Sequence, residues 1–582
     1  MSHRRQIIKL GTFVVFMIAS FCRGGEPYPV PPPKPANNEI QVGTYIFPGW
    51  YRDQGKNDYD YPNADERSEW RQIAKFAHPR PLLGFYDDSL PEVNDWHIKW
   101  ALEAGITWFA FDWYWNAGEK RLMRTLERGF LKARYNKKIK FCIHWCNHGL
   151  DWRKQRDFSR PALEEMIHYC AENYFKRPNY LMVNNRPMFM IWDLPAVVEA
   201  NEGAEAFKRN VLPSLNTICR DHGLGDLFIV PVNNSPHQVR NFPVGDAFTG
   251  YSYGGFTTRT PWGTPGSAPF AEMVEMLPRY WDAMHTSSLP FITSTQANWD
   301  NTTRTLGGNR PDHRWIRTGF TIELFERNLR DGAARVKSKL PYFLIEAWNE
   351  WGEGSIIEPS KEDGFKRLEA VRRVFAPNAP PPQWQRPTPQ QVESYSVLKG
   401  EELKAARERE ARPDPKPVVY QWSIDLAYDP PSLPGKILEE IRFDKAESLK
   451  RIPQRAATEF IGIHNGRGRF KIVGDDSWLL IKGDWGPMNT IQGVAVRLSY
   501  DGPWNLAEFY WQTDAKKLGH DRRNYNLIND GKLHTYLLSF RPQLRGPDKL
   551  QAVRIDFPAC KDTTAELEWI RIIGNGPATR PK

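Results

Sequence analysis

Apolar, β-branched and aromatic runs alternate with longer amphipathic stretches between residues 39 and 378. Eight of the runs have the length of strands, and the clearest are EIQVGTYIF (39–47), ITWFAFDWYW (106–115) and KIKFCIHWCN (138–147). The others lie at 186–194, 226–234, 246–255, 290–300 and 342–350. Helices are expected between them, at 93–105, 121–135, 161–175, 203–220, 270–285, 323–338 and 364–375.

Strands that alternate with helices in this way favour a parallel sheet. Eight such units in about 340 residues predict an α/β fold, namely a (β/α)8 TIM barrel with insertions. An open doubly wound sheet is the alternative. Its dinucleotide-binding form loses support because no glycine-rich phosphate turn follows any of the strands.

The pattern changes after residue 378. Residues 379–416 contain two proline-rich stretches around the charged segment EELKAARERE and predict a semi-rigid linker with one short helix. From 417 to 576, short strand-like runs are separated by Gly, Asp and Asn turns, which predicts an all-β sandwich of jelly-roll type. This domain either supports the barrel or is a carbohydrate-binding module, and its candidate stacking residues are Trp478, Trp485, Trp504 and Trp511.

The first 25 residues have the pattern of a secretory signal peptide. Arg4, Arg5 and Lys9 precede an apolar run from Leu10 to Phe21, which is too short to span a bilayer. The bulky Phe21 argues against a lipid anchor at Cys22. No later stretch is long and apolar enough for a membrane span, so we expect a secreted or periplasmic protein.

A proline-rich tether is expected at residues 26–38, between the signal peptide and the first domain. The five cysteines that remain after cleavage show no metal-type spacing and are predicted to be buried thiols.

Composition narrows the class of protein. The chain of 582 residues is 40% hydrophobic and 13% aromatic, which excludes global disorder. The net charge is +10, but no basic run is interleaved with aromatic residues, so no nucleic-acid partner is expected. The 23 tryptophans have two interpretations, a large core or platforms on which sugar rings stack.

Catalytic groups of such barrels lie at the carboxyl ends of the strands. Here these ends carry carboxylates and amides among indoles and phenols, a combination that predicts a sugar cleft, although each residue alone is more often structural. The candidate substrate-binding residues are Tyr45, Trp50, Tyr51, Asp112, Trp113, Tyr114, His144, Trp145, Asn147, Trp192, Tyr251, Tyr253, Trp299, Asp300, Asn349 and Trp351.

Glu350 and Glu353 are the candidate catalytic pair, because glycosidic cleavage uses two carboxyl groups. If they begin a helical turn, their Cβ atoms lie about 5–6 Å apart. That is nearer to the separation found in retaining glycosidases than in inverting ones. Mutual repulsion would raise the pKa of one of them, which would then serve as the acid. The alternative is that Glu353 only caps a helix.

The segment IEAWNEWGEGSIIEP (345–359) resembles the E-W-x-E-G signature of glycoside hydrolase family 99. It is also similar to WbsX-like proteins of bacterial polysaccharide loci, which are described as glycosyltransferases. The resemblance is collinear over about residues 39–378. Further matching stretches are GTYIFPGWY (43–51), AGITWFAFDWYW (104–115), FCIHWCN (141–147), RPNYL (177–181), RPMFMIW (186–192) and NWDNTTR (298–304).

The resemblance implies a retaining, endo-acting α-mannosidase fold that works through a 1,2-anhydro sugar. By motif position, Glu350 would deprotonate the substrate 2-hydroxyl, and Glu353 would be the general acid and then the base. Gly352 stands where the mannosidases often have histidine, which leaves the sugar open.

Other functions remain as alternatives. A glycosyltransferase would use cytosolic sugar nucleotides, whereas this chain is expected to be exported, and its D-x-D triplet Asp58–Asp60 lies in a polar loop. A non-catalytic glycan-binding protein is the second alternative. Motifs for serine, cysteine or zinc hydrolysis are missing. We therefore expect a glycosidase that acts on a poly- or oligosaccharide without a metal or cofactor.

Overall fold

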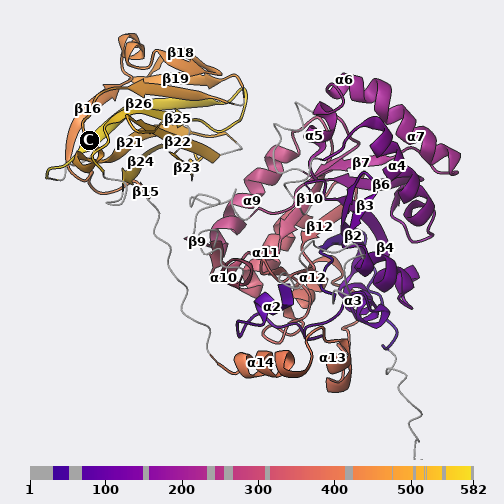
Figure 1. The fold of residues 1–582 in the computed structure, drawn as a ribbon. Coiled ribbons are helices and arrows are strands. Elements are labelled where there is room, and N and C mark those ends of the chain that lie inside the picture. The colour runs from indigo at the N-terminus through magenta and orange to yellow at the C-terminus, as the bar shows by residue number, and fades with distance from the viewer. Residues whose placement is uncertain are drawn as a thin grey trace, which may run out of the picture.

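The computed structural model describes residues 30–51, 69–148, 156–232, 243–253, 266–307, 315–412, 424–474, 476–502, 506–516, 518, 521–540 and 546–577. They form a mixed α/β domain and a later β domain (Figure 1). The predicted signal peptide with Cys22, the Asp58–Asp60 triplet and Trp504 lie outside the described residues.

Eight parallel strands form the centre of the first domain. Their order is β8-β10-β12-β1-β2-β4-β6-β7, and every neighbouring pair in this order is parallel. Each strand coincides with one of the eight segments expected from the sequence, and only β2 extends beyond its segment, by one residue. The bounds are β1 Gln41–Ile46, β2 Ile106–Asn116, β4 Lys140–Trp145, β6 Arg186–Ile191, β7 Phe228–Pro231, β8 Phe248–Thr249, β10 Phe291–Gln296 and β12 Tyr342–Glu346.

The two ends of this curled sheet meet at a single parallel bridge, between Val232 and Thr249. β8 has only two residues, and residues 233–242 lie outside the described part of the chain. The described strands therefore form a curled parallel sheet whose last pair lacks a regular ladder, whereas the sequence predicted regular barrel closure.

Helices follow most of the strands, as expected. The larger ones are α3 Pro91–Ala104, α4 Arg160–Cys170, α7 Leu212–Asp221, α9 Phe270–Met284, α11 Ile322–Ala333 and α12 Lys366–Phe375. The helix predicted at 121–135 is an exception. A π turn at Thr125–Gly129 and a 3-10 turn at Phe130–Lys132 replace it. Gly129 packs so closely here that a Cβ would lie 2.3 Å from the carbonyl oxygen of Asp88.

Aromatic side chains fill the first core. Side chains of adjacent strand residues point to opposite faces. On β2, Asp112 contacts His144 of β4 on the inner face of the curled sheet. Trp113 and Trp115 instead stack on each other and on Tyr169 of α4. Among the described residues twelve tryptophans are fully buried, eleven in this domain and Trp569 in the later one, so the large-core interpretation accounts for about half of the 23.

Parts of the expected tether and linker pack against the first domain. Val30 is buried, and its carbonyl oxygen accepts a hydrogen bond of 2.7 Å from the Tyr135 hydroxyl. The expected linker contains α13 Pro389–Tyr395 and α14 Gly400–Glu410, and Tyr395 is buried in the first core. These segments are more firmly attached than free spacers.

The β domain has two antiparallel sheets around a separate apolar core. The seven-stranded sheet has the order β15-β24-β21-β26-β19-β18, with β16 paired to β26, and the five-stranded sheet has the order β17-β20-β25-β22-β23. β16, β17, β18 and β23 were not expected from the sequence. The bounds are β15 Ile424–Tyr428, β16 Lys436–Arg442, β17 Gln454–Ala456, β18 Thr458–His464, β19 Arg467–Ile472, β20 Trp478–Lys482, β21 Ile491–Tyr500, β22 Leu506–Thr513, β23 Asp521–Asn526, β24 Leu533–Phe540, β25 Leu550–Asp556 and β26 Thr564–Gly574.

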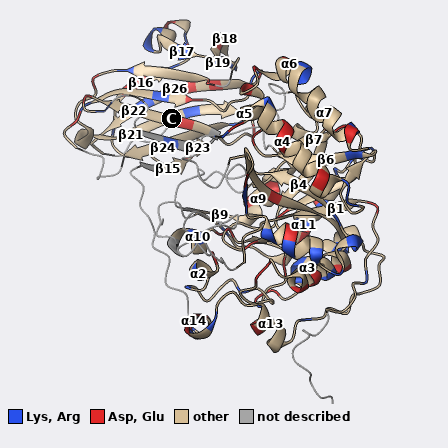
Figure 2. Cartoon of the chain, turned by 45° about the vertical axis from the view of Figure 1, so that its right-hand side comes forward, with Lys and Arg blue, Asp and Glu red and all other residues tan. Residues whose placement is uncertain are grey.

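Among the described residues, no helix combines the length and apolar character that crossing a bilayer requires. The five cysteines in this part of the chain are buried thiols that form no disulfide. Lysine and arginine are interspersed with aspartate and glutamate along the helices of the first domain (Figure 2).

Candidate active site

The acidic pair lies on a short hairpin after the last parallel strand. β12 ends at Glu346, and β13 Asn349–Glu350 pairs with β14 Ser355–Ile356. The backbone N–H of Glu353 donates to the carbonyl oxygen of Glu350 at 3.1 Å. The two glutamates are therefore joined by a turn of a hairpin, and the expectation of a helical turn is wrong.

One guanidinium connects the pair. Arg304, on α10 Thr302–Gly307, donates from Nη2 to Oε2 of Glu350 at 3.2 Å and from Nη1 to Oε1 of Glu353. The same Nη2 lies 3.0 Å from Oε1 of Glu69, on α2 Glu69–Ile73. Three carboxylates thus share one positive charge.

Tyr251 joins this cluster to the opposite strands. Its hydroxyl lies 3.2 Å from Oε1 of Glu350 and 3.3 Å from Oδ2 of Asp112. The other oxygen of Asp112 lies 2.7 Å from Nδ1 of His144. The result is a chain of polar contacts from β4 to the hairpin.

Aromatic rings surround this polar chain. The ring of Tyr45 lies 4.6 Å from that of Tyr251 and 5.1 Å from that of His144. Trp192 follows β6, is half-buried, and packs 5.0 Å from the Tyr251 ring. Trp192 is therefore an indole beside the polar groups that keeps part of its surface accessible.

Burial raises the pKa of three glutamates at the turn. The pKa of Glu350 is well above its ordinary value because of burial and the neighbouring Glu353, while Arg304 acts in the opposite direction. Burial also raises the pKa of Glu353, and Arg304 again lowers it. For Glu346, burial and the charge of Glu353 raise the pKa well above its usual value. Protons are therefore held here at pH values where exposed glutamates are ionised.

Glycine at position 352 is explained by this cluster. A Cβ there would lie 2.0 Å from Oε2 of Glu69 and 2.9 Å from Nε of Arg304. The ion pair of Glu69 and Arg304 thus occupies the space of a side chain at this position.

Several predicted substrate-binding residues belong to the core. Trp113 and Trp145 point toward the helices, and Trp145 donates to the carbonyl oxygen of Trp115 at 3.1 Å. Trp50 packs 4.2 Å from Trp70. None of the three can stack openly on a sugar in this conformation.

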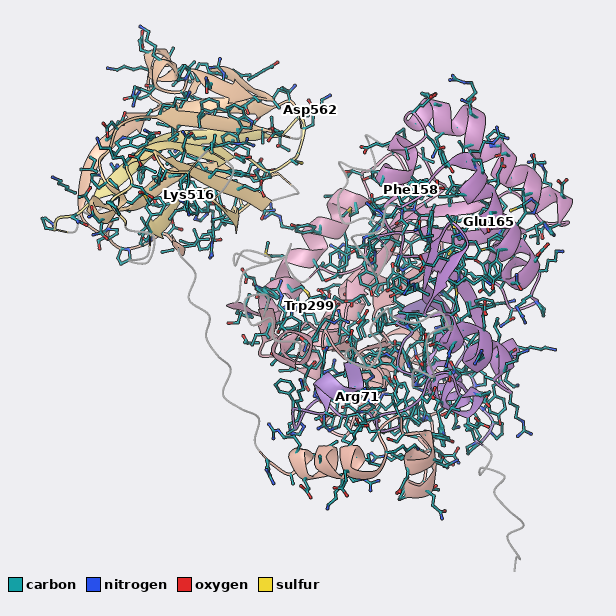
Figure 3. All side chains as sticks on the ribbon, in the orientation of Figure 1. Arg71, Phe158, Glu165, Trp299, Lys516 and Asp562 are labelled. Atoms are coloured by element: carbon teal, nitrogen blue, oxygen red, sulfur yellow. The ribbon has the colours of Figure 1, made fainter. Side chains whose placement is uncertain are left out.

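Three others are also enclosed. The indole N–H of Trp351 donates to Glu358 at 2.8 Å, and the hydroxyl of Tyr253 lies 2.6 Å from Oγ of Ser294. Trp299 packs with Ala268 and Trp315 in a small separate cluster (Figure 3).

Two predicted amide contacts hold strand ends together. The side chain of Asn349 accepts from the N–H of Phe47 and donates to its carbonyl oxygen, both at 2.9 Å. Asn147 makes the same pair of bonds with the backbone of Asp193, at 2.7 and 2.9 Å. Both amides are engaged by the backbone.

The last three predicted residues lie nearer the rim. Tyr51 is buried with Arg124 over its ring, and Tyr114 lies 6.0 Å from the ring of His148. The N–H of Asp300 donates to the carbonyl oxygen of Glu353, which supports the turn.

The sequence places Arg304 and Glu346 at strand ends but assigns them no role in the site, and it does not mark Glu69. Two close carboxylates can be balanced by a cation, which is one signal for an arginine nearby. Glu69 is distant in sequence and no local pattern marks it.

Asp112, His144 and Cys146 place one donor atom each within 4.8 Å of one another, a set that could hold a small cation. The 2.7 Å contact of Asp112 with His144 already accounts for two of these donors. Burial raises the pKa of Cys146 well above its usual value, which disfavours the thiolate that a metal needs. The cluster is therefore explained without an ion.

The family model described as glycosyltransferase WbsX matches residues 68–371, more than half of the chain. The chain belongs to this family. The resemblance to WbsX-like proteins inferred from the sequence is thereby confirmed. The match includes the hairpin with Glu350 and Glu353 and the arginine between them.

The curated relatives are from Xanthomonas campestris pv. campestris. The relative from strain B100, uncharacterized protein WxcX, is 24% identical over 340 residues, covering 53% of this chain and 46% of the relative. The relative from strain ATCC 33913 has the same values. The chain thus spans less than half the length of the curated relatives it matches.

Solved structures show weaker likeness. A glycoside hydrolase-like protein is 17% identical with a TM-score of 0.40, covering 60% of this chain and 97% of its own. The GH99 endo-alpha-mannosidase from Bacteroides thetaiotaomicron, in complex with bis-tris-propane, is 18% identical with a TM-score of 0.38, covering 57% and 96%. The xylan-binding module CBM86 from Roseburia intestinalis is 8% identical with a TM-score of 0.17, covering 26% and 96%.

Proposed function

We propose that the first domain hydrolyses glycosidic bonds in a poly- or oligosaccharide, using Glu350 and Glu353. The observation that carries this proposal is the single guanidinium of Arg304 bonded to both carboxyl groups. Glu69 shares the same guanidinium, so one positive charge cannot balance all three carboxylates, and burial favours retention of a proton within the pair. One acid and one base side by side are what glycosidic cleavage requires.

The hydrogen bonds favour Glu350 as the base. Its two oxygens accept from Tyr251 and Arg304 respectively, and these donors favour the ionised form against burial and the neighbouring Glu353, which raise its pKa. Glu353 accepts from Arg304 at Oε1, and its side chain is 17% exposed compared with 6% for Glu350. Glu353 is therefore the better placed group to meet a leaving oxygen.

In the first step, Glu350 takes the proton of the substrate 2-hydroxyl, and O2 attacks C1. The bond from C1 to the glycosidic oxygen breaks as Glu353 gives its proton to that oxygen. In the second step, Glu353 takes a proton from water, whose oxygen attacks C1 and opens the 1,2-anhydro ring. Glu350 returns its proton to O2, so both glutamates end as they began and the anomeric configuration is retained.

A glycosyltransferase is the second candidate, because the family model carries that description. The charge of the cluster opposes it. Glu69, Glu350 and Glu353 surround Arg304, and Asp112 is linked through Tyr251, so a donor diphosphate would face carboxylates. An exported protein would also be separated from cytosolic sugar nucleotides. The signal-peptide pattern of the first 25 residues is the reason why we propose a secreted or periplasmic location.

The decisive experiment is a screen of the protein from residue 26 onward against neutral and acidic glycans, with new reducing ends as the readout. Glu350→Gln and Glu353→Gln should each reduce turnover by about 10²–10⁴-fold. Glu393→Gln is the control, because its side chain is 65% exposed on α13. Turnover near the wild-type rate in either active-site variant would overturn the proposal.

Parallel reactions separate the alternatives. New glycosidic bonds that form only with an added sugar nucleotide would establish a transferase. Binding without new ends in any reaction would establish a glycan-binding protein. A 2-deoxy analogue of a cleaved substrate tests the chemistry, because it lacks the attacking oxygen. It should remain intact, whereas its cleavage would indicate direct attack by a carboxylate.

A further inference from the structure

The five-stranded sheet of the β domain has two unlike faces. Successive side chains of a strand alternate between them. One face enters the core of the domain through Leu479, Ile481, Phe509, Trp511, Val553 and Ile555. The residues between these point away from the core, and Trp478, Tyr510 and Arg554 are half-buried there.

These three side chains form a row across β20, β25 and β22. Tyr510 is the register partner of Arg554, and Trp478 is the partner of Asp556. The guanidinium carbon of Arg554 lies 4.8 Å from the ring centroids of both Trp478 and Tyr510. Because both centroids lie that close to one carbon, the two rings are at most twice that distance apart, with the guanidinium between them.

Carboxylates fix the arginine within the row. Asp556 accepts from Nε of Arg554 at 2.7 Å, and Asp476 accepts from its Nη2. Asp476 also accepts from the indole N–H of Trp478 at 3.2 Å. Because these bonds fix both the ring and the guanidinium, binding a ligand here would cost little side-chain entropy.

The chemistry of the row distinguishes it from other surface aromatics. Ile461 and Ile463 are exposed aliphatic side chains on the other sheet, whereas here two rings flank a hydrogen-bonding centre. Rings supply flat apolar surface, and the aspartates and arginine supply acceptors and donors. Such a mixture suits a ligand with apolar ring faces and many hydroxyls.

Charge defines the ligand class further. Arg554 is balanced by Asp476 and Asp556. Glu508 lies next to Tyr510 on this face and adds negative charge, while Lys482 is exposed at the far end of β20. Among the described side chains of β20, β25 and β22, this face carries no positive excess, which disfavours polyanions such as acidic polysaccharides and nucleic acids.

We propose that the outer face of β20, β25 and β22, built on Trp478, Arg554 and Tyr510, is a second glycan-binding site that takes a neutral oligosaccharide. A ligand that contacts both rings has to reach across the guanidinium of Arg554 between them. The site is separate from the acidic hairpin of the first domain and does not depend on its activity. Its role is to hold the chain on a polysaccharide.

The test uses the full chain from residue 26 and measures retardation in native gels that contain soluble mannan, xylan, β-glucan or heparin. At least one neutral polysaccharide should retard the wild type, and heparin should not. Trp478→Ala and Tyr510→Ala should each weaken that binding about tenfold or more. Trp485→Ala is the matched control, because Trp485 is also half-buried but bonds to Glu439 of β16.

Trp478→Phe and Tyr510→Phe keep a ring and should retain most of the affinity, and circular dichroism checks that each variant is folded. Glu350→Gln should bind like the wild type, which separates this site from the first domain. The proposal is overturned if no neutral polysaccharide binds, or if folded alanine variants bind unchanged. Retardation by heparin alone, or loss of binding only in Glu350→Gln, overturns it as well.

Discussion

The hydroxyl of Tyr251 lies 3.2 Å from Oε1 of Glu350, although 99 residues separate the two in sequence. The same hydroxyl lies 3.3 Å from Oδ2 of Asp112. A phenol has one hydrogen, so it donates to one of these oxygens at a time. The bond to Glu350 stabilises its ionised form, which is the form that a base requires.

Tyr251→Phe should therefore lower kcat/KM by about 10–100-fold. Loss of the donor raises the pKa of Glu350 further, so the acidic limb of the pH–rate profile should move to higher pH. Tyr253→Phe is the control, because its hydroxyl contacts Ser294 within the core. That variant should lose some stability and keep the wild-type pH profile. A Tyr251→Phe profile identical with the wild type would contradict the role given to this bond.

Arg304→Gln should shift the same limb in the same direction and by more. Without the cation, the carboxyl groups of Glu69, Glu350 and Glu353 lose their shared partner, and their pKa values rise. Activity at neutral pH should fall by about 10²-fold or more. Arg304→Lys keeps the positive charge but loses the planar, two-pronged guanidinium. Its activity should therefore lie between those of the wild type and Arg304→Gln. Equal effects of both substitutions would show that charge is irrelevant here.

Gly352→Ala should reduce activity through the ion pair behind it. The added carbon would lie 2.0 Å from Oε2 of Glu69, so Glu69 or Arg304 must move. A loss of about 10-fold in kcat/KM with little change in melting temperature is expected, because small misplacements at an active site are costly. Gly546→Ala is the control, since a Cβ there meets nothing within 4 Å. Full activity of Gly352→Ala would mean that catalysis does not need the ion pair of Glu69 and Arg304 in this geometry.

The stability of the first domain should change with pH through Asp95. Burial raises its pKa to about 6, above the ordinary value, although it accepts a hydrogen bond of 2.8 Å from the N–H of Tyr135. A raised carboxyl pKa means that the folded state holds the proton more tightly than the unfolded state. The stabilisation is complete at low pH and is lost as the pH rises through about 6.

Asp95→Asn should remove this dependence, which amounts to at most about 3 kcal/mol for a pKa raised from 3.8 to about 6, before screening by solvent. Thermal melts at pH 4 and pH 7 measure it. Asp282 should contribute a pH dependence of stability with the opposite sign, because hydrogen bonding to Arg335 lowers its pKa. Asp282→Asn removes that contribution. The exposed Asp282 pair should contribute little. An unchanged pH dependence in Asp95→Asn would contradict the assignment.

The alternation of strands and helices could be read from the sequence because its runs are long and separated by clear breaks. What those runs could not show is the direction of each side chain. Strands buried on both faces are apolar throughout, so no alternation distinguishes Asp112, which points inward, from Trp113, which packs under α4. For this reason several tryptophans were assigned to a sugar cleft when they belong to the core.

The turn at Glu350 shows a second limit. Spacing of three residues suggested a helix, but Gly354 has φ of +66° and allows the chain to reverse. Glu350 then pairs with Ser355 in a hairpin. The contact with Arg304 depends on tertiary structure, so the sequence could indicate the need for a cation without identifying it.

The side-chain amides of Asn349 and Asn147 each accept from a backbone N–H and donate to a backbone carbonyl oxygen, as the backbone of a neighbouring strand would. Aspartate has the same shape but lacks the N–H, and it would place its charge against a carbonyl oxygen. Among the candidate residues at the strand ends, these two positions should therefore vary least in amino-acid type between relatives. New specificities would arise instead by exchange of residues such as Trp192, whose half-buried ring carries no such constraint.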